Sequence, residues 1–288
     1  MKTIAGPDPN PVKPGYVPPP GACDAHCHVF GPAHKFPYAA DRPYTPPDAP
    51  VEALRKLHAH LGISRAVIVH PSCHGADMRV TLDAIASSNG RYRGVAVVGK
   101  NVTDTELARL DAGGIRGVRF NFVAHLGGAP DLELFDRMLG RVVELGWHVV
   151  LHLDADDILT YADRIKRIRV PFVIDHMGRV KAEGGLEQKP FRMLLELMRN
   201  ELAWVKVCGA ERVSSAGKPF HDAIPFAAAL IDAAPDRILW GTDWPHPNVK
   251  IMPNDGEIVD WFAACCTDEA LRRKTLVDNP TRLYWANT

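Results

Sequence analysis

The chain has 288 residues, of which 46% are hydrophobic and 24% charged. Such a composition can bury a sizeable core, which excludes disordered, collagen-like and low-complexity classes, and the length suits one large domain. The 34 Lys and Arg residues balance the 34 Asp and Glu residues. No overall field therefore favours nucleic acid or an anionic membrane surface, and any charged partner must be met locally.

The N-terminal residues and the cysteines indicate the compartment. Residues 1–16 carry only Lys2 and Lys13 as positive charges and contain no apolar run, so we expect no secretory signal. No apolar run elsewhere approaches the roughly eighteen residues of a membrane span. The six cysteines form no CxxC pair and lie in apolar segments, which indicates reduced, mostly buried thiols. We therefore expect a cytoplasmic protein.

Proline marks the first segment of the chain. Residues 6–20 contain seven prolines, too many for a helix or a central strand. We expect an extended, Pro-rich arm over residues 1–20 and one folded domain over residues 21–288.

The folded domain alternates short apolar runs with amphipathic stretches. The predicted strands cover residues 22–30, 65–71, 93–98, 115–122, 148–153, 172–176, 204–208 and 237–241. The predicted helices include residues 51–61, 78–86, 106–110, 132–145, 158–168, 191–199 and 223–233, where apolar residues recur at spacings of three and four. Eight such units predict a parallel sheet, closed as a single (β/α)8 TIM barrel or open and doubly wound. We favour the barrel because polar residues end many strands and because no GxGxxG or Walker sequence follows a strand.

The first strand carries two imidazoles on one face. Side chains alternate along a strand, so His26 and His28 point the same way and Cys27 points to the other face. A lone histidine in such a strand would most simply be a core residue with its hydrogen bonds made inside the protein. A pair inside an apolar strand favours a functional role.

Three further strands end in residues of the same kind. His152 ends the fifth strand, His176 the sixth and Asp243 the eighth. Any one of them could be structural, but together with His26 and His28 they converge on the mouth of a barrel, where such folds build active sites.

The motifs that carry these residues resemble a known family. HxH at residues 26–28, DHMG at 175–178 and GTDWPHPN at 241–248 look like the amidohydrolase superfamily, and within it the 2-pyrone-4,6-dicarboxylate lactonase group. PPPGACDAHCHVFGP, CHGAD, GIRGVRFNF, IDHMGR and NPTRLYW extend the resemblance over residues 18–285. HxH alone would be a weak signal, whereas the set is specific.

The resemblance implies hydrolysis of a carboxylate-bearing cyclic ester in aromatic-compound catabolism. In that group the residues matching His26, His28 and His176 surround the lactone carbonyl, and the residue matching Asp243 activates water. These residue types suit the chemistry, which needs an activated water, a group that stabilises the oxyanion and a proton source for the leaving oxygen.

Several residues are expected to bind the substrate. Arg119 shares strand parity with Asn121 and should point into the site, where a guanidinium can grip a carboxylate; Arg116 has the opposite parity. Arg212 matches a substrate arginine of the family, although pairing with Glu211 is nearly as good a reading. Tyr44, Ser72 and His74 also match substrate-facing segments of the family.

Two departures from the family pattern bear on substrate and metal. His125 stands where the dicarboxylate lactonases carry a second arginine, and His152 where they carry a tyrosine. His26, His28, His152 and Asp243 form a three-imidazole, one-carboxylate set that is suitable for one zinc ion, whereas the dicarboxylate lactonases work without metal. Strand four has no lysine, so we do not expect a binuclear site.

The expected partner is a small anionic lactone, and the expected assembly a monomer or small homo-oligomer. A sugar-acid lactonase is the nearest alternative. A metal-dependent decarboxylase of the same superfamily would use the same four ligands but release carbon dioxide. A ligand-binding relic without catalysis is the remaining alternative, which both the Asp243 carboxylate and its imidazole neighbours argue against.

Overall fold

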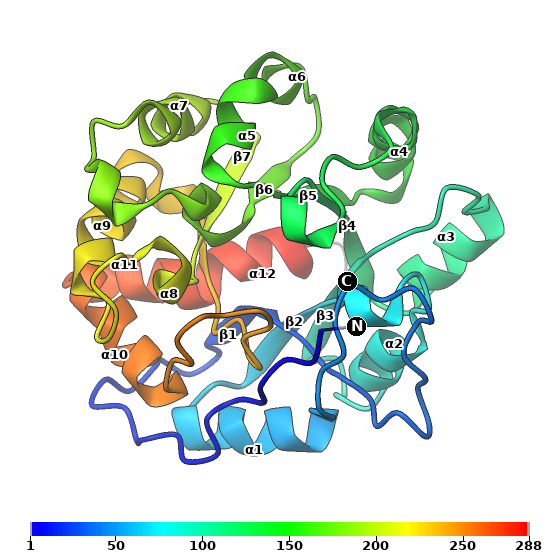
Figure 1. The fold of residues 1–288 in the computed structure, drawn as a ribbon, viewed down its shortest axis with the longest axis horizontal. Helices are drawn as coiled ribbons and strands as arrows, with labels where there is room; N and C mark the ends of the chain where they lie inside the picture. Colours follow the sequence, from blue (N-terminus) through cyan, green and yellow to red (C-terminus); the bar gives the residue numbers. More distant parts are fainter. Residues whose placement is uncertain (1, 287–288) are drawn as a thin grey trace.

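The computed structural model describes residues 2–286, in which eight parallel strands form one sheet in sequence order. Figure 1 shows helices arranged around these strands. The strands are β1 (Cys23–Cys27), β2 (Arg65–Val69), β3 (Tyr92–Ala96), β4 (Ile115–Asn121), β5 (His148–His152), β6 (Phe172–Ile174), β7 (Ala203–Val207) and β8 (Ile238–Trp240). The predicted (β/α)8 barrel is confirmed.

The helices follow the strands in alternation. Before β8 they are α1 (Val51–Leu61), α2 (Arg79–Ala86), α3 (Asp104–Ala112), α4 (Leu132–Leu145), α5 (Ala155–Thr160), α6 (Ala162–Lys166), α7 (Lys189–Leu197), α8 (Ala210–Val213) and α9 (Ile224–Ala233). After β8 they are α10 (Asp255–Cys265), α11 (Glu269–Arg273) and α12 (Asn279–Tyr284). Helices α1 and α4 have the predicted bounds, whereas the helix predicted over 158–168 is divided into α5 and α6 at Tyr161.

Helix α4 shows why the apolar periodicity predicts these elements well. Phe135, Met138 and Val142 recur at spacings of three and four and are all buried. The Asp131 carboxylate accepts from the first free N–H groups of the helix, and Gly146, with φ of 64°, ends it. The buried stripe turns α4 toward the sheet.

The alternation of side chains along the strands divides the core in two. In β2, Val67 and Val69 belong to a cluster inside the barrel, whereas Ala66 and Ile68 pack under the helices. The inward positions of β5 continue upward from Val150 to His152. Inward side chains at the carboxyl ends of the strands therefore meet at one mouth.

The first and last strands meet through backbone groups at this mouth. Asp243 N–H donates to the His26 carbonyl, and His28 N–H donates to the Trp244 carbonyl, both at 2.7 Å. Glycine at position 241 permits the approach, since a Cβ there would lie 2.5 Å from the His26 nitrogen. We call this contact the seam of the barrel.

The described part of the Pro-rich arm contains no helix, and it is fastened to α10. Val12 N–H donates to the Asn254 side chain at 2.9 Å, and the Gly15 and Tyr16 N–H groups donate to the Asp260 carboxylate. Within residues 2–286, no helix is long and apolar enough to cross a bilayer.

Candidate active site

A narrow pocket opens at the carboxyl ends of the strands. It is lined by His28, Tyr44, Ser72, Arg119, His125, Leu126, His152, His176, Arg212, Asp243, Pro247 and Asn248. Most of the residues predicted from the sequence to form a site therefore meet here. His26 lies directly behind the lining. His74 also stays out of it, because its Nε2 accepts from Gly31 N–H and its Nδ1 faces the Pro37 carbonyl.

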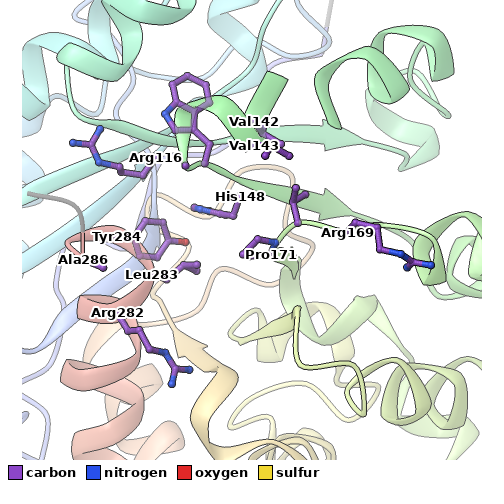
Figure 2. A pocket seen from close by; sticks show the side chains of 13 residues that line it. Arg116, Val142, Val143, His148, Arg169, Pro171, Arg282, Leu283, Tyr284 and Ala286 are labelled. Atoms are coloured by element: carbon purple, nitrogen blue, oxygen red, sulfur yellow. The ribbon is translucent and has the colours of Figure 1, made fainter. Parts of the chain in front are cut away.

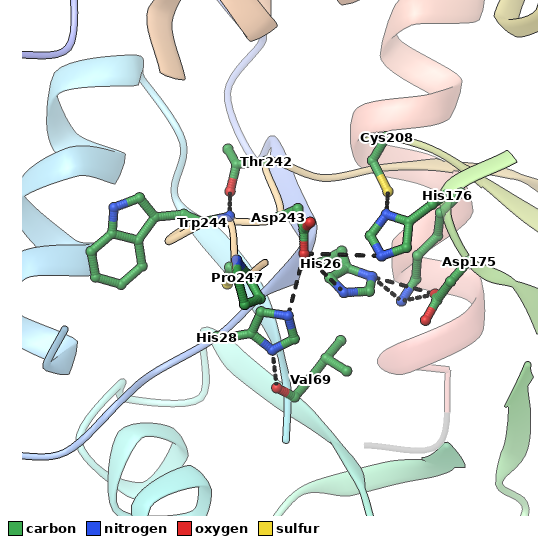
Figure 3. Close-up of polar contacts among 12 residues, drawn as sticks. His26, His28, Val69, Asp175, His176, Cys208, Thr242, Asp243, Trp244 and Pro247 are labelled. Atoms are coloured by element: carbon green, nitrogen blue, oxygen red, sulfur yellow. Dashed lines mark hydrogen bonds and ion pairs between the residues drawn. The ribbon is translucent and has the colours of Figure 1, made fainter. Parts of the chain in front are cut away.

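Asp243 lines this pocket, and Figure 3 shows it between the imidazoles of His26, His28 and His176. Its Oδ1 is 3.5 Å from His26 Nε2, 3.3 Å from His28 Nε2 and 4.0 Å from His176 Nε2. The Arg212 guanidinium donates to Oδ2, with Nε at 3.0 Å. Burial alone would raise the pKa of Asp243, but the charge of Arg212 and the neighbouring imidazoles outweigh burial and hold the pKa well below its usual value. Asp243 is therefore a carboxylate at neutral pH, with Oδ1 facing the imidazoles.

A second buried carboxylate, Asp24, fixes the position of Asp243. It accepts from the backbone N–H groups of His26 and Thr242, both at 3.0 Å, and from the Thr242 hydroxyl at 2.6 Å. His58 Nε2 lies 3.1 Å from Asp24 Oδ2, the oxygen that also accepts from the Thr242 hydroxyl. Asp24 thus ties β1 to the segment after β8. Sequence reasoning missed it, although an aspartate two residues before His26, in an apolar strand, was a usable signal.

Behind His26 lies a buried ion pair that sequence reasoning also missed. Lys206 Nζ is 3.1 Å from both Asp175 Oδ1 and His26 Nδ1, and all three side chains are fully buried. Asp175 Oδ1 is 3.3 Å from His26 Nδ1. Burial and the Lys206 ammonium lower the pKa of His26 to about 4. A lysine within the apolar run of β7 was the available signal, because lysine is almost never buried unpaired.

His28 is oriented by the neighbouring strand. Its Nδ1 lies 2.7 Å from the Val69 carbonyl, so the ring donates through Nδ1–H and turns Nε2 toward Asp243. Nε2 and Asp243 Oδ1 are 3.3 Å apart. A proton or a cation can be shared between these two atoms.

His152 and His176 form the far wall of the pocket, with ring centroids 5.3 Å apart. His152 Nδ1 lies 2.9 Å from Asn121 Oδ1, and its buried Nε2 has no hydrogen-bond partner among residues 2–286. Burial, reinforced by neighbouring positive groups, lowers the pKa of both imidazoles well below the usual value. Both rings are therefore neutral at pH 7.

The two arginines of the pocket differ in their contacts. Arg119 is 5% exposed, donates to the His70 carbonyl at 3.0 Å, and lies no closer than 3.9 Å to a carboxylate of the described residues, that of Asp175. Arg212 is engaged by Asp243 and by Glu211, whose Oε1 lies 3.3 Å from Arg212 Nε. Arg119 is therefore the freer of the two cations.

The remaining predicted substrate residues surround the opening. Tyr44 is buried, Ser72 is half-buried and His125 is exposed, with its ring centroid 6.3 Å from that of His152. Partial shielding of the ring from solvent, together with Arg179 and Arg212, lowers the pKa of His125 to about 4. His125 thus presents a neutral ring at the mouth.

Three residues of the site fit a metal ion. One ligand atom from each of His26, His28 and Asp243 lies within 4.8 Å of the others. The short distance between His28 Nε2 and Asp243 Oδ1 is the observation that favours a cation, and the bonded Nδ1 is typical of metal-binding histidines. His152, the fourth ligand expected from the sequence, is not part of this group and turns its Nδ1 to Asn121.

A second hollow of about 330 Å³ lies at the opposite end of the barrel, between the start of β5, the start of β6 and α12 (Figure 2). Trp147, His148, Val170 and Tyr284 are among the residues that line it. It lacks the cluster of carboxylate and imidazoles found at the mouth, so we place the site at the mouth.

Comparison with known proteins adds a family match, two similar relatives and a similar solved structure. The Amidohydrolase family model matches residues 23–285. A 2-pyrone-4,6-dicarboxylate hydrolase of Comamonas testosteroni is 44% identical and covers 96% of this chain and 94% of its own. A 4-sulfomuconolactone hydrolase of Rhizobium radiobacter is 47% identical, with 92% and 90% covered. A solved structure from Pseudomonas putida, named as a candidate 2-pyrone-4,6-dicarboxylic acid hydrolase, superposes with a TM-score of 0.81 at 35% identity and covers 93% of this chain and 98% of its own.

Proposed function

The chain belongs to the amidohydrolase family, and from this membership and the geometry of the mouth we propose that it hydrolyses a small anionic lactone. The observation that carries the proposal is Asp243 Oδ1, which is buried, has no hydrogen-bond donor among residues 2–286, and is faced by three imidazole Nε2 atoms. Such a group can accept a proton from a water molecule held between it and the substrate.

The reaction needs three functions, and the residues of the mouth can supply them. Asp243 accepts a proton as water attacks the lactone carbonyl carbon, and Arg212 on Oδ2 keeps Oδ1 turned to the water. Imidazole N–H groups of the wall, His176 foremost, stabilise the oxyanion that forms on the carbonyl oxygen. The ring C–O bond then breaks, and the proton held by Asp243 passes to the leaving oxygen, directly or through His28.

Arg119 supports an anionic substrate. It is a buried guanidinium whose Nε has no partner among the described residues, and it lines the pocket. Burying a cation this way is costly unless a ligand neutralises it, and a carboxylate or sulfonate suits its planar set of donors. The two relatives described above act, by their names, on lactones with such groups.

A single divalent metal, such as zinc, would be held by His26, His28 and Asp243. When bound, it would polarise the carbonyl or lower the pKa of water. Metal-free catalysis by the same residues is the alternative, with a proton in place of the cation between His28 and Asp243.

The other activities have less support. A D-galactarolactone isomerase of Agrobacterium fabrum and an L-fucono-1,5-lactonase of Burkholderia ambifaria are 29% and 26% identical, well below the 44–47% of the relatives that act on aromatic-derived lactones. A sugar-acid lactonase therefore remains second. No contact of the site favours a decarboxylase.

A lactone panel tests the proposal. The purified protein is assayed with a pH indicator on 2-pyrone-4,6-dicarboxylate, 4-sulfomuconolactone, a neutral lactone and a sugar-acid lactone, with and without chelator, after its zinc content is measured. We expect acid release on an anionic aromatic-derived lactone and up to one zinc per chain. Acid release on the sugar-acid lactone alone would contradict the substrate assignment. A fully active enzyme with less than about a tenth of an equivalent of metal would establish the metal-free route.

A further inference from the structure

The imidazole of His176 is held on its Nδ1 side by the two residues that follow β7. Cys208 Sγ lies 3.2 Å from His176 Nδ1, and both side chains are buried (Figure 3). Gly209, with φ of 72°, leaves room for the ring, because a Cβ there would lie 2.8 Å from Nδ1. His176 itself has φ of 52°, outside the strand conformation. The ring is therefore fixed by contacts on the side away from the pocket.

The direction of the Cys208–His176 hydrogen bond follows from the chemistry of the buried thiol. Burial raises the pKa of the Cys208 thiol well above its usual value, so the sulfur keeps its proton. A neutral thiol is a donor and only a weak acceptor, whereas an unprotonated imidazole nitrogen is a good acceptor. The thiol thus donates to Nδ1.

The other side of the ring leads to the same assignment. His176 Nε2 faces Asp243 Oδ1 at 4.0 Å, and a carboxylate there favours an N–H over a lone pair. Both neighbours therefore place the single proton of His176 on Nε2.

We propose that Cys208 is a positioning residue, whose S–H bond to Nδ1 keeps the His176 proton on Nε2, facing the pocket. The catalytic consequence rests on the proposed lactone hydrolysis: His176 meets the carbonyl oxygen as a hydrogen-bond donor, and Asp243 remains the group that takes the proton of water. A thiol in this place does what a carbonyl or carboxylate does for many catalytic histidines, but it selects the opposite tautomer.

Other buried cysteines of the chain do not have this contact. Cys27, Cys265 and Cys266 direct Sγ to backbone carbonyls, of Val67, Trp261 and Asp268 respectively. Cys265 is 6% exposed and lies in α10, so Cys265→Ala is a matched control for the loss of a buried thiol.

The kinetic test compares Cys208→Ala, Cys208→Ser and Cys265→Ala on the lactone that the wild type hydrolyses best. We expect Cys208→Ala to lower kcat about fivefold, the effect of one neutral hydrogen bond, with little change in KM. Cys208→Ser keeps a donor and should recover most of the rate, and Cys265→Ala should leave it unchanged. An unaltered kcat in Cys208→Ala, or a Cys208→Ser as slow as Cys208→Ala, would overturn the proposal.

A spectroscopic test needs no substrate. In protein labelled with ¹⁵N-histidine, the His176 ring signals are assigned by their loss in His176→Gln, and their shifts report which nitrogen is protonated. We expect the proton on Nε2 in the wild type and in Cys208→Ser, and a population on Nδ1 in Cys208→Ala. A wild-type ring protonated on Nδ1 would refute the role of Cys208. If no lactone is hydrolysed, the proposed function fails, and this measurement still decides the tautomer.

Discussion

Asp243 carries a negative charge, and its Oδ1 faces the pocket without a hydrogen-bond donor among the described residues. Replacing the carboxylate by an amide tests whether this charge is needed to accept a proton. Asp243→Asn keeps the shape and removes the proton acceptor, so kcat should fall by about 10²- to 10⁴-fold while KM changes little. Steady-state kinetics on the preferred lactone measure this. Asp41→Asn, at an exposed aspartate, is the control and should behave as wild type. More than a tenth of the activity left in Asp243→Asn would remove Asp243 from the role of base.

Arg119 and Arg116 lie on the same strand with opposite parity. Arg119→Met should raise KM for anionic lactones by roughly ten- to a hundredfold, the equivalent of a lost charge-assisted contact of about 1.5 to 3 kcal/mol. Neutral lactones should be spared. Arg116, which donates to Asp111 outside the pocket, supplies the matched control Arg116→Met. Equal losses on neutral and anionic substrates would make Arg119 structural.

The sequence identifies polar residues at the ends of apolar strands, because their residue type is unusual there. It misses residues whose role depends on which distant side chains they contact. Strand parity and motif resemblance predict that His28, His176 and Asp243 face one space, and the structure brings them together. A lysine in an apolar strand marks Lys206 as unusual, but the partners of Lys206 and Cys208 lie about 180 and 32 positions away and are visible only in the structure. No local pattern encodes such pairs.

The loop after β4 is the element expected to select the substrate. His125 lies there, in a short helical turn over Ala124–Leu126, and presents a neutral ring beside the pocket. Replacing it by arginine adds a permanent charge and a rigid fork. His125→Arg should shift the ratio of kcat/KM toward 2-pyrone-4,6-dicarboxylate, relative to 4-sulfomuconolactone, by about tenfold, or about 1.4 kcal/mol. An unchanged ratio would show that this loop does not set specificity.

The strands and the amphipathic helices are predicted closely because the spacing of apolar residues follows a single period in each kind of element. Helix α4 begins and ends at the predicted residues, since its cap and its C-terminal glycine are local signals. Strand β6 ends at Ile174, two residues before the predicted end, because the backbone at His176 and Met177 turns into the left-handed region. Periodicity carries no information about such a turn, yet this turn determines where the His176 ring points.

For the whole molecule, buried neutral histidines determine the stability in mild acid. Burial lowers the pKa of His70 and of His148 to about 3, from the usual value of 6.5. Between these values the unfolded chain binds more protons than the folded chain, so stability is complete above about pH 6.5 and is lost as the pH falls. Each fully buried histidine contributes a slope of about 1.4 kcal/mol per pH unit in this range.

Chemical denaturation at several pH values between 7 and 4.5 tests this expectation. The free energy of unfolding should decrease steadily over this range, and the decrease above about pH 5.5 precedes the titration of ordinary carboxylates. His148→Gln removes one titrating group and should flatten the slope by about one proton. A free energy that stays level down to pH 4.5 would show that these imidazoles are protonated in the folded chain.

The seam joins residues separated by 218 positions in the chain, from Asp24 to Thr242, and the backbone that closes it belongs to His26 and Asp243. Contacts of such long range form late, because the loop entropy between the two ends must be overcome first. An intermediate with its helices and most strands in place but its ends apart would have the spectrum of a nearly native protein and no catalytic centre. The recovery of enzymatic activity during refolding therefore reports when the two ends join. It should lag behind the recovery of secondary structure.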